Sequence, residues 1–290
     1  MDENTFLKNL DALSEPLLQE LDMTAGIHGS FPSVAGLKEI IALIKAIVFP
    51  DFFDFRRNEA FLRRHYIGVN LDNLYRQLTV QIRRALRFCK DCAEDDARTL
   101  ALRFVDRLPE IKRLLYTDVE AMYNNDPAAD NYAEVILSYP IVHAMVHYRT
   151  AHALSQLDIP VIPRVITELA HSDTGIDINP KAQIGEYFAI DHGTGVVIGE
   201  TCIVGNHVTI YQGVTLGAKN FSLDSNGHPM NIPRHPIIED NVTIYSNSSI
   251  LGRITVGHDS VIGGNIWLTH SVPPGSRILQ SSAVADKLSS

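Results

Sequence analysis

Two short segments of this sequence concentrate the ionisable side chains that chemistry needs. One is the run Asp191-His192-Gly193-Thr194-Gly195, and the other is Pro233-Arg234-His235-Pro236. The imidazole of histidine titrates near neutral pH, so it can exchange a proton with a bound molecule. Both segments fall where a regular pattern in the sequence is broken. Breaks of this kind are where a repeat protein extrudes loops, and such loops commonly carry function.

The pattern that these segments interrupt is an aliphatic residue at every sixth position. Neither a helix nor a strand returns a side chain to the same surroundings after six residues, so the period predicts a hexapeptide β-helix. The position after the aliphatic residue is often glycine, and we expect a turn there. Thirteen positions follow the rule: Ile178, Ile184, Ile190, Ile198, Val204, Ile210, Leu216, Ile238, Ile244, Ile250, Val256, Ile262 and Leu268.

The sequence before the hexads predicts helices. Segments such as 37–48 and 100–108 repeat apolar residues at spacings of three and four. We therefore expect an α+β protein with an N-terminal α-helical domain at 1–174. A left-handed parallel β-helix of four to five coils follows at 175–275, with an extended loop at 218–237, and a short tail occupies 276–290. Flat solenoid sides with exposed apolar rows are expected to assemble a homotrimer or a dimer of trimers.

The composition excludes several classes of function. A formal charge of −9 over 290 residues argues against binding to nucleic acid or to an anionic membrane. The sequence shows no apolar leader and no apolar run of about 18 residues, which predicts a cytoplasmic location. Three cysteines do not make a disulfide framework. Cys89 and Cys92 lack a second cysteine pair to complete a zinc site, so we expect two free thiols and no metal.

On this scaffold, the two segments resemble those of the serine O-acetyltransferases of cysteine biosynthesis. Matching segments cover about residues 120 to 275, and what the resemblance implies is transfer of acetyl from acetyl-CoA to the hydroxyl of L-serine. The further segments that carry the resemblance are Asp126-Pro127-Ala128, His147-Tyr148-Arg149, Asp177-Ile178-Asn179-Pro180, Gly199-Glu200-Thr201 and Val214-Thr215-Leu216-Gly217.

The resemblance also implies roles for individual residues. His192 is the general base for the serine hydroxyl, and Asp177 binds the far nitrogen of its imidazole. Asp177 lies fifteen residues before His192, so the two could meet on adjacent turns or across a subunit interface. The resemblance implies four further substrate contacts and four small residues along the pantetheine arm. These are Asp126 and Asp191 for the serine ammonium, Arg234 for its carboxylate, His235 as a second polar contact, and Gly217, Ala218, Ser246 and Gly264 for the arm.

The resemblance also implies how the activity is regulated, and the sequence departs from the family in three places. L-Cysteine carries the same charged groups as serine, so we expect it to be a feedback inhibitor. The loop 219–233 is longer than in the family, and Asn179 stands where the family has histidine. The end of the sequence, 283–290, lacks the family's long tail with a terminal isoleucine, which makes an association with cysteine synthase doubtful.

Other functions fit parts of the pattern. A structural role for Asp126 as a helix cap stays open. A hexapeptide O-acetyltransferase could act on another hydroxyl, of a sugar or of homoserine, without a clamp for a zwitterion. A β-helix could also be non-catalytic. A zinc enzyme of the γ-carbonic-anhydrase type needs three histidines with two in an H-x4-H pair, and the histidines of the hexad region contain no such pair.

Overall fold

Seven helices precede the hexads in the part of the chain that the structure describes. The structure is a computed structural model that describes Ser14 and residues 30–53, 60–89, 96–220, 223–225, 227, 228, 230 and 232–280. The described residues from Pro32 onward belong to one compact unit. The helices are α3 (Val34–Val48), α4 (Ala60–Leu86), α5 (Ala97–Val105), α6 (Leu108–Asn125), α7 (Tyr132–Ser138), α8 (Pro140–Ser155) and α9 (Ile162–Thr174).

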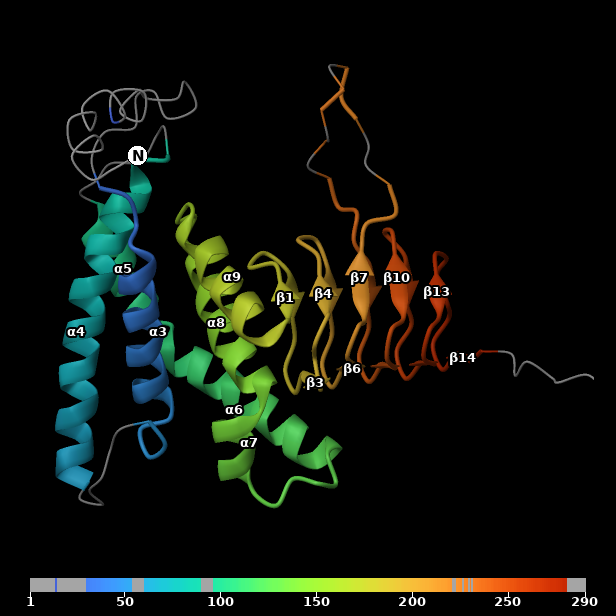
Figure 1. Ribbon diagram of the computed structural model, residues 1–290, viewed down its shortest axis with the longest axis horizontal. Coiled ribbons are helices and arrows are strands. Elements are labelled where there is room, and N and C mark those ends of the chain that lie inside the picture. Colours follow the sequence, from blue (N-terminus) through green and yellow to red (C-terminus); the bar gives the residue numbers. More distant parts are fainter. Residues whose placement is uncertain are drawn as a thin grey trace, which may run out of the picture. The chain divides into compact units, whose positions relative to one another are not determined.

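The hexads form a left-handed β-helix, as the sequence predicts. Fourteen short parallel strands stack into three flat sheets (Figure 1). Sheet A holds β1 (Asp177–Ile178), β4 (Val197–Ile198), β7 (Thr215–Gly217), β10 (Ser249–Leu251) and β13 (Trp267–Leu268). Sheet B holds β2 (Gln183–Ile184), β5 (Ile203–Val204), β8 (Ile237–Ile238) and β11 (Thr255–Val256). Sheet C holds β3 (Ala189–Asp191), β6 (Thr209–Tyr211), β9 (Thr243–Ile244), β12 (Val261–Ile262) and β14 (Arg277–Ile278).

The hexad residues fill the interior of the solenoid. All thirteen predicted aliphatic positions are buried, and most are fully enclosed. Cys202 is buried as expected, and burial raises the pKa of its thiol to about 12. Stacked strands of Ile and Val make a continuous apolar column, whose burial is the main stabilising contribution to such a repeat.

The glycines after the hexad positions have a different role from the predicted turn. A Cβ on Gly185 would lie 2.6 Å from the Gly205 carbonyl oxygen, and one on Gly257 would lie 2.3 Å from the Pro274 nitrogen. Close approach of neighbouring coils therefore demands these glycines. The left-handed backbone of the corners falls two residues later, as at Tyr187 and His207.

A buried ion pair joins the helices to the first coil. The Arg149 guanidinium on α8 donates to both carboxylate oxygens of Asp118 on α6, at 2.9 and 3.1 Å. It also donates to the carbonyl oxygens of Ile184 and Gly185, at 2.7 and 2.6 Å. Because both side chains are about 3% exposed, loss of either would leave an uncompensated buried charge. This contact fixes α6 against the solenoid.

The structure corrects the prediction of two free thiols. Helix α4 ends at Leu86, and Cys89 lies beyond that end and is disulfide-bonded. Cys92 lies outside the described residues, as do 281–290, so the prediction about the C-terminal tail and cysteine synthase stays a prediction. In the described part of the chain, no helix combines the length and the apolar character that a membrane span requires.

Candidate active site

The corner after β3 presents His192 to solvent. His192 has a φ of +58°, and Gly193 and Gly195 follow with φ of +79° and +78°. This left-handed turn accommodates two extra residues in its coil. Asp177 pairs with Val197, twenty residues later, whereas Val197 pairs with Thr215, eighteen residues later. The His192 side chain is 73% exposed, and its Nε2 lies 3.8 Å from Asp191 Oδ1. An accessible imidazole beside a carboxylate suits proton transfer.

Helix α6 brings a second carboxylate to the same corner. Asp126 follows the end of α6, and the neighbouring Asn125 Nδ2 donates to Thr209 Oγ1 on β6 at 3.0 Å. The pKa of the Asp126 carboxyl is lowered, first by a hydrogen bond from Tyr139 and then by the backbone N–H of Ala128. The charge of His192 contributes to the same lowering. Asp126, Asp191 and His192 therefore converge from segments far apart in the sequence.

Tyr139 contacts the candidate site, which the sequence did not reveal. Its hydroxyl donates to Asp126 Oδ2 at 2.5 Å, and this hydrogen bond raises the pKa of Tyr139 to about 12. Nothing in the spacing of Tyr139 points to this contact. The bond orients the Asp126 carboxylate toward the corner. Asp126 does not cap α7, since the side chain of Asn131 does so.

Asp177 lies at the start of β1, beside the end of the His192 corner. Its backbone N–H donates to the Val196 carbonyl at 2.9 Å. The Asp177 carboxylate accepts from Arg164 Nη1 at 3.2 Å, and Arg164 Nη2 also pairs with Glu168 at 2.9 Å. Among the hydrogen bonds of the described residues, none joins Asp177 to His192. The predicted Asp177–His192 contact stays a prediction.

One cluster in the described part of the chain offers donor atoms for a metal. Atoms of Glu168, His171 and Asp177 lie within 4.8 Å of one another, and Arg164 already supplies positive charge to both carboxylates. A cluster with one histidine does not match the three histidines of a γ-carbonic-anhydrase site.

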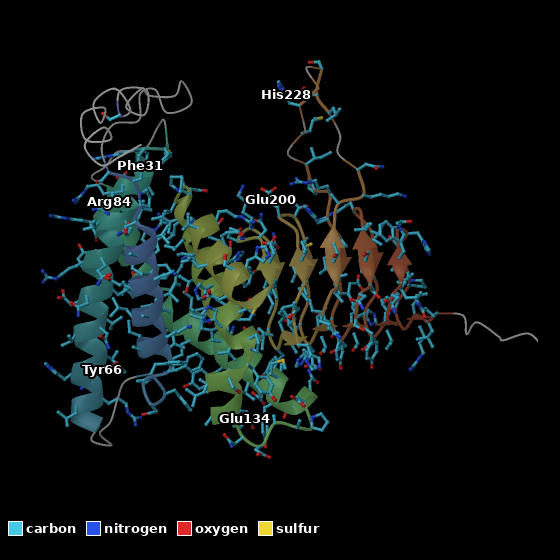
Figure 2. All side chains as sticks on the ribbon, viewed as in Figure 1. Phe31, Tyr66, Arg84, Glu134, Glu200 and His228 are labelled. Carbon is cyan, nitrogen blue, oxygen red and sulfur yellow. The ribbon has the colours of Figure 1, made fainter. Side chains whose placement is uncertain are left out.

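Arg234 lies at another corner, between sheets A and B, next to Glu200. Arg234 Nη2 donates to Glu200 Oε2 at 2.9 Å, and Lys181 holds Oε1 of the same carboxylate at 2.9 Å. The pKa of Glu200 is lowered by Lys181 and then by Arg234. The Nε atom of Arg234 is buried and has no hydrogen-bond partner among the described residues. Figure 2 shows Glu200 on the side of the solenoid from which the loop carrying His228 extends.

His235 packs into this corner instead of projecting from it. The side chain is buried against Gly199, where a Cβ would lie 2.0 Å from the imidazole. Its Nδ1 accepts from the Thr201 backbone N–H at 3.1 Å. Burial, followed by the charge of Arg234, lowers the pKa of His235. The lowered pKa favours the neutral imidazole, and Thr201, which His235 holds, accepts through Oγ1 from the Arg234 backbone N–H at 2.9 Å.

Eight of the ten predicted site residues thus fall on two edges that border sheet A. We call the corner between sheets C and A the histidine edge, and it carries Asp191, His192, Ser246 and Gly264. We call the corner between sheets A and B the arginine edge, and it carries Gly217, Ala218, Arg234 and His235. About five residues at ~3.3 Å each separate the edges, a distance on the order of 15 Å.

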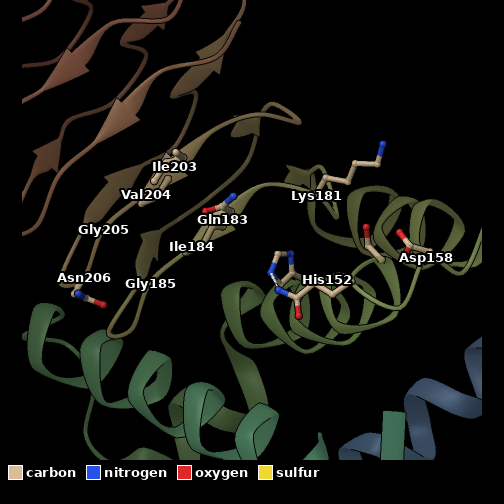
Figure 3. Close-up of a pocket in the computed structure, with 12 residues that line it drawn as sticks. His152, Asp158, Lys181, Gln183, Ile184, Gly185, Ile203, Val204, Gly205 and Asn206 are labelled. Atoms are coloured by element: carbon tan, nitrogen blue, oxygen red, sulfur yellow. Dashed lines mark hydrogen bonds between the residues drawn. The ribbon is translucent and has the colours of Figure 1, made fainter. Parts of the chain in front are cut away.

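A large groove in the described part of the chain lies elsewhere. A cavity of about 650 Å³ opens where α8 meets sheet B, and Figure 3 shows His152 and Lys181 at one end and Asn206 at the other. None of the residues predicted for the site lines it. The volume of this groove therefore does not identify the candidate site, because most of the predicted site residues lie on the two edges of sheet A.

The fold and the His192 corner define a hexapeptide-repeat acyltransferase. No protein-family model matches the chain. A serine acetyltransferase of Synechococcus elongatus is 45% identical over 89% of this chain and 85% of the relative. The chain therefore belongs to the serine acetyltransferase family.

Solved structures of the family share the fold. Serine acetyltransferase 1 of Entamoeba histolytica in complex with L-cysteine superposes with a TM-score of 0.74, at 34% identity, over 95% of this chain and 98% of that chain. A Brucella abortus serine acetyltransferase in complex with coenzyme A gives a TM-score of 0.57 at 28% identity, over 84% of this chain and 93% of that chain.

Proposed function

We propose that this chain transfers acetyl from acetyl-CoA to the hydroxyl of L-serine, the reaction that opens cysteine biosynthesis. The observation that carries the proposal is the convergence of an exposed imidazole, His192, with the carboxylates of Asp126 and Asp191. A neutral His192 accepts the hydroxyl proton as the serine oxygen attacks the thioester carbonyl. The two carboxylates attract the serine ammonium and stabilise the imidazolium that forms. The products are O-acetyl-L-serine and CoA.

Arg234 is proposed to bind the serine carboxylate. Its buried Nε lacks a partner among the described residues, while Glu200 already holds Nη2. The side chain is 22% exposed, so a substrate carboxylate can approach its outer nitrogens, and a planar guanidinium binds carboxylates in a fixed orientation. L-Cysteine presents the same ammonium and carboxylate, so we propose that it inhibits by occupying this site.

The separation of the two edges supports a site shared between subunits. The charged groups of serine are only a few ångströms apart, whereas one chain holds Arg234 and His192 on opposite borders of sheet A. An arginine edge from a neighbouring subunit would complete the histidine edge. The residues proposed for the pantetheine arm, Gly217, Ala218, Ser246 and Gly264, divide between the same edges.

Light scattering tests this assembly. We expect a homotrimer or a dimer of trimers, with a solution mass near three or six times 32.2 kDa, because closed threefold symmetry pairs each histidine edge with an arginine edge. A monodisperse monomer with full activity would contradict the shared site.

An acceptor panel tests the substrate. Thiol release from acetyl-CoA is measured with L-serine, homoserine, threonine and a set of sugars. We expect L-serine to have the highest kcat/KM, because an acceptor without ammonium and carboxylate leaves Asp126 and Arg234 unpaired. A sugar with the highest kcat/KM would replace serine as the acceptor.

Asp177→Asn is expected to lower kcat by about 10- to 100-fold and to change the KM for serine less. The substitution keeps the shape but removes the charge that would orient His192 and stabilise its protonated form. Steady-state kinetics measures the division between kcat and KM. Asp259→Asn, at an exposed solenoid corner, is the matched control and should leave both constants near wild type. An effect of Asp177→Asn on KM alone would make Asp177 a substrate contact.

A further inference from the structure

The outward-facing residues of sheet A form a column in register. Their order is fixed by backbone pairing between successive coils, and the first residue of each strand faces away from the buried core. The column begins at the candidate catalytic residue Asp177 and ends at Trp267. Its members in order are Asp177, Val197, Thr215, Ser249 and Trp267.

Trp267 is unlike the rest of the column. It is 72% exposed, the highest value among the large hydrophobic side chains that the structure describes, and it is the one tryptophan in the sequence. Water on a bare indole is unfavourable, so a large exposed aromatic ring often marks a binding surface. Between Trp267 and Asp177 the column carries only smaller side chains. This arrangement leaves a shallow path that ends at a flat ring.

The length of the path is close to that of the pantetheine arm of acetyl-CoA. Four steps between strands at ~4.8 Å each place Trp267 about 19 Å from Asp177 (Figure 1). The pantetheine arm has about 13 bonds from sulfur to the first phosphorus, or ~16 Å at the reach of an extended chain. The remaining ~3 Å is shorter than the diphosphate and ribose, so the adenine meets Trp267 when the molecule bends at the diphosphate. Helix α9 packs against β1, so the arm can run only toward β13.

Two cations lie on the arginine edge, across sheet A from Trp267. Lys219 and Arg253 are exposed and line a pocket of about 280 Å³ together with Arg234 and with Thr269, two residues after Trp267. Arg253 uses Nη1 to hold the carbonyl oxygens of Thr201 and His235, which fixes its position. Phosphate groups favour such paired cations. Sheet A thus offers a ring for a base near one border and positive charge for phosphates at the other.

We propose that Trp267 is the stacking surface for the adenine ring of CoA. The proposal rests on the proposed function, since it places the thioester at His192 and runs the arm along sheet A. Stacking of a base on an aromatic side chain contributes roughly 5- to 100-fold in affinity. Trp267 therefore sets the affinity for the nucleotide end of the co-substrate and takes no part in the chemistry.

The single tryptophan makes its own fluorescence the direct test. We expect CoA to quench the emission of the wild-type protein, whereas pantetheine, which lacks the adenine nucleotide, leaves it unchanged. Trp267→Val places in the column the residue that already stands at Val197. This variant should raise the KM for acetyl-CoA roughly 5- to 100-fold while kcat and the KM for serine stay constant. Trp267→Tyr should recover most of the affinity, and Tyr116→Val, an exposed aromatic on α6, should have no effect.

The same measurements can overturn the proposal. An unchanged KM for acetyl-CoA in Trp267→Val would refute it. So would dissociation of the assembly by this variant, together with emission that CoA does not alter, which would make the indole a subunit contact. A wild-type protein that CoA quenches but that does not acetylate serine would keep the adenine site and refute only the proposed function.

Discussion

His192→Ala is expected to lower kcat for serine acetylation by about 10²- to 10⁴-fold, the usual loss when a general base is removed. The affinity for CoA should stay near wild type, because the imidazole lies at the corner before Val197 and the proposed arm runs away from it along sheet A. The measurements are steady-state kinetics and a CoA titration followed by thermal stabilisation.

The matched control is His258→Ala. His258 is also an exposed solenoid histidine beside a carboxylate, since its Nδ1 lies 2.6 Å from Asp259 Oδ2. It lies on the corner between sheets B and C, away from both edges of sheet A. Its replacement should leave kcat unchanged. Turnover of His192→Ala within a few-fold of wild type would remove His192 from the mechanism.

Arg234→Ala should weaken serine and cysteine together, by about 2–5 kcal/mol each, the cost of deleting one partner of a desolvated charge pair. Both amino acids offer the same carboxylate, and the guanidinium of Arg234 is largely enclosed, since Nη2 pairs with Glu200 and Nη1 donates to the Ile232 carbonyl oxygen. The measurements are the KM for serine and the inhibition constant for cysteine. Both should rise by similar factors.

Arg234→Lys separates charge from geometry. Lysine keeps the positive charge but lacks the planar fork, so we expect only partial recovery of serine affinity. If cysteine still inhibits Arg234→Ala while serine binding collapses, the two amino acids do not share a site.

The periodic part of the fold was predictable because its cause is local. A side chain at every sixth residue points inward in each face, so the row from Ile178 to Leu268 identified the solenoid and its interior without knowledge of any distant contact. The two interruptions of this period identified the segments that contain His192 and Arg234. The turn conformation was misplaced by two residues, because steric contact between coils, not a turn, requires glycines such as Gly185.

The convergence of distant segments at the candidate site could not be predicted from the sequence. Asp126 comes near His192 because α6 docks on the first coils through contacts such as the buried Asp118–Arg149 pair, and no periodicity encodes that docking. Tyr139 on Asp126, Arg164 on Asp177 and Glu200 on Arg234 are contacts of the same kind.

By itself, the sequence determined the coil, its interior and the corners that leave the repeat, since each depends on neighbours within one hexad. Only the tertiary structure decided which corners share an edge, which carboxylate each cation holds, and that His192 and Arg234 lie on opposite borders of sheet A. Those outcomes depend on how coils stack and helices dock, and the energies involved come from side chains far apart in the chain.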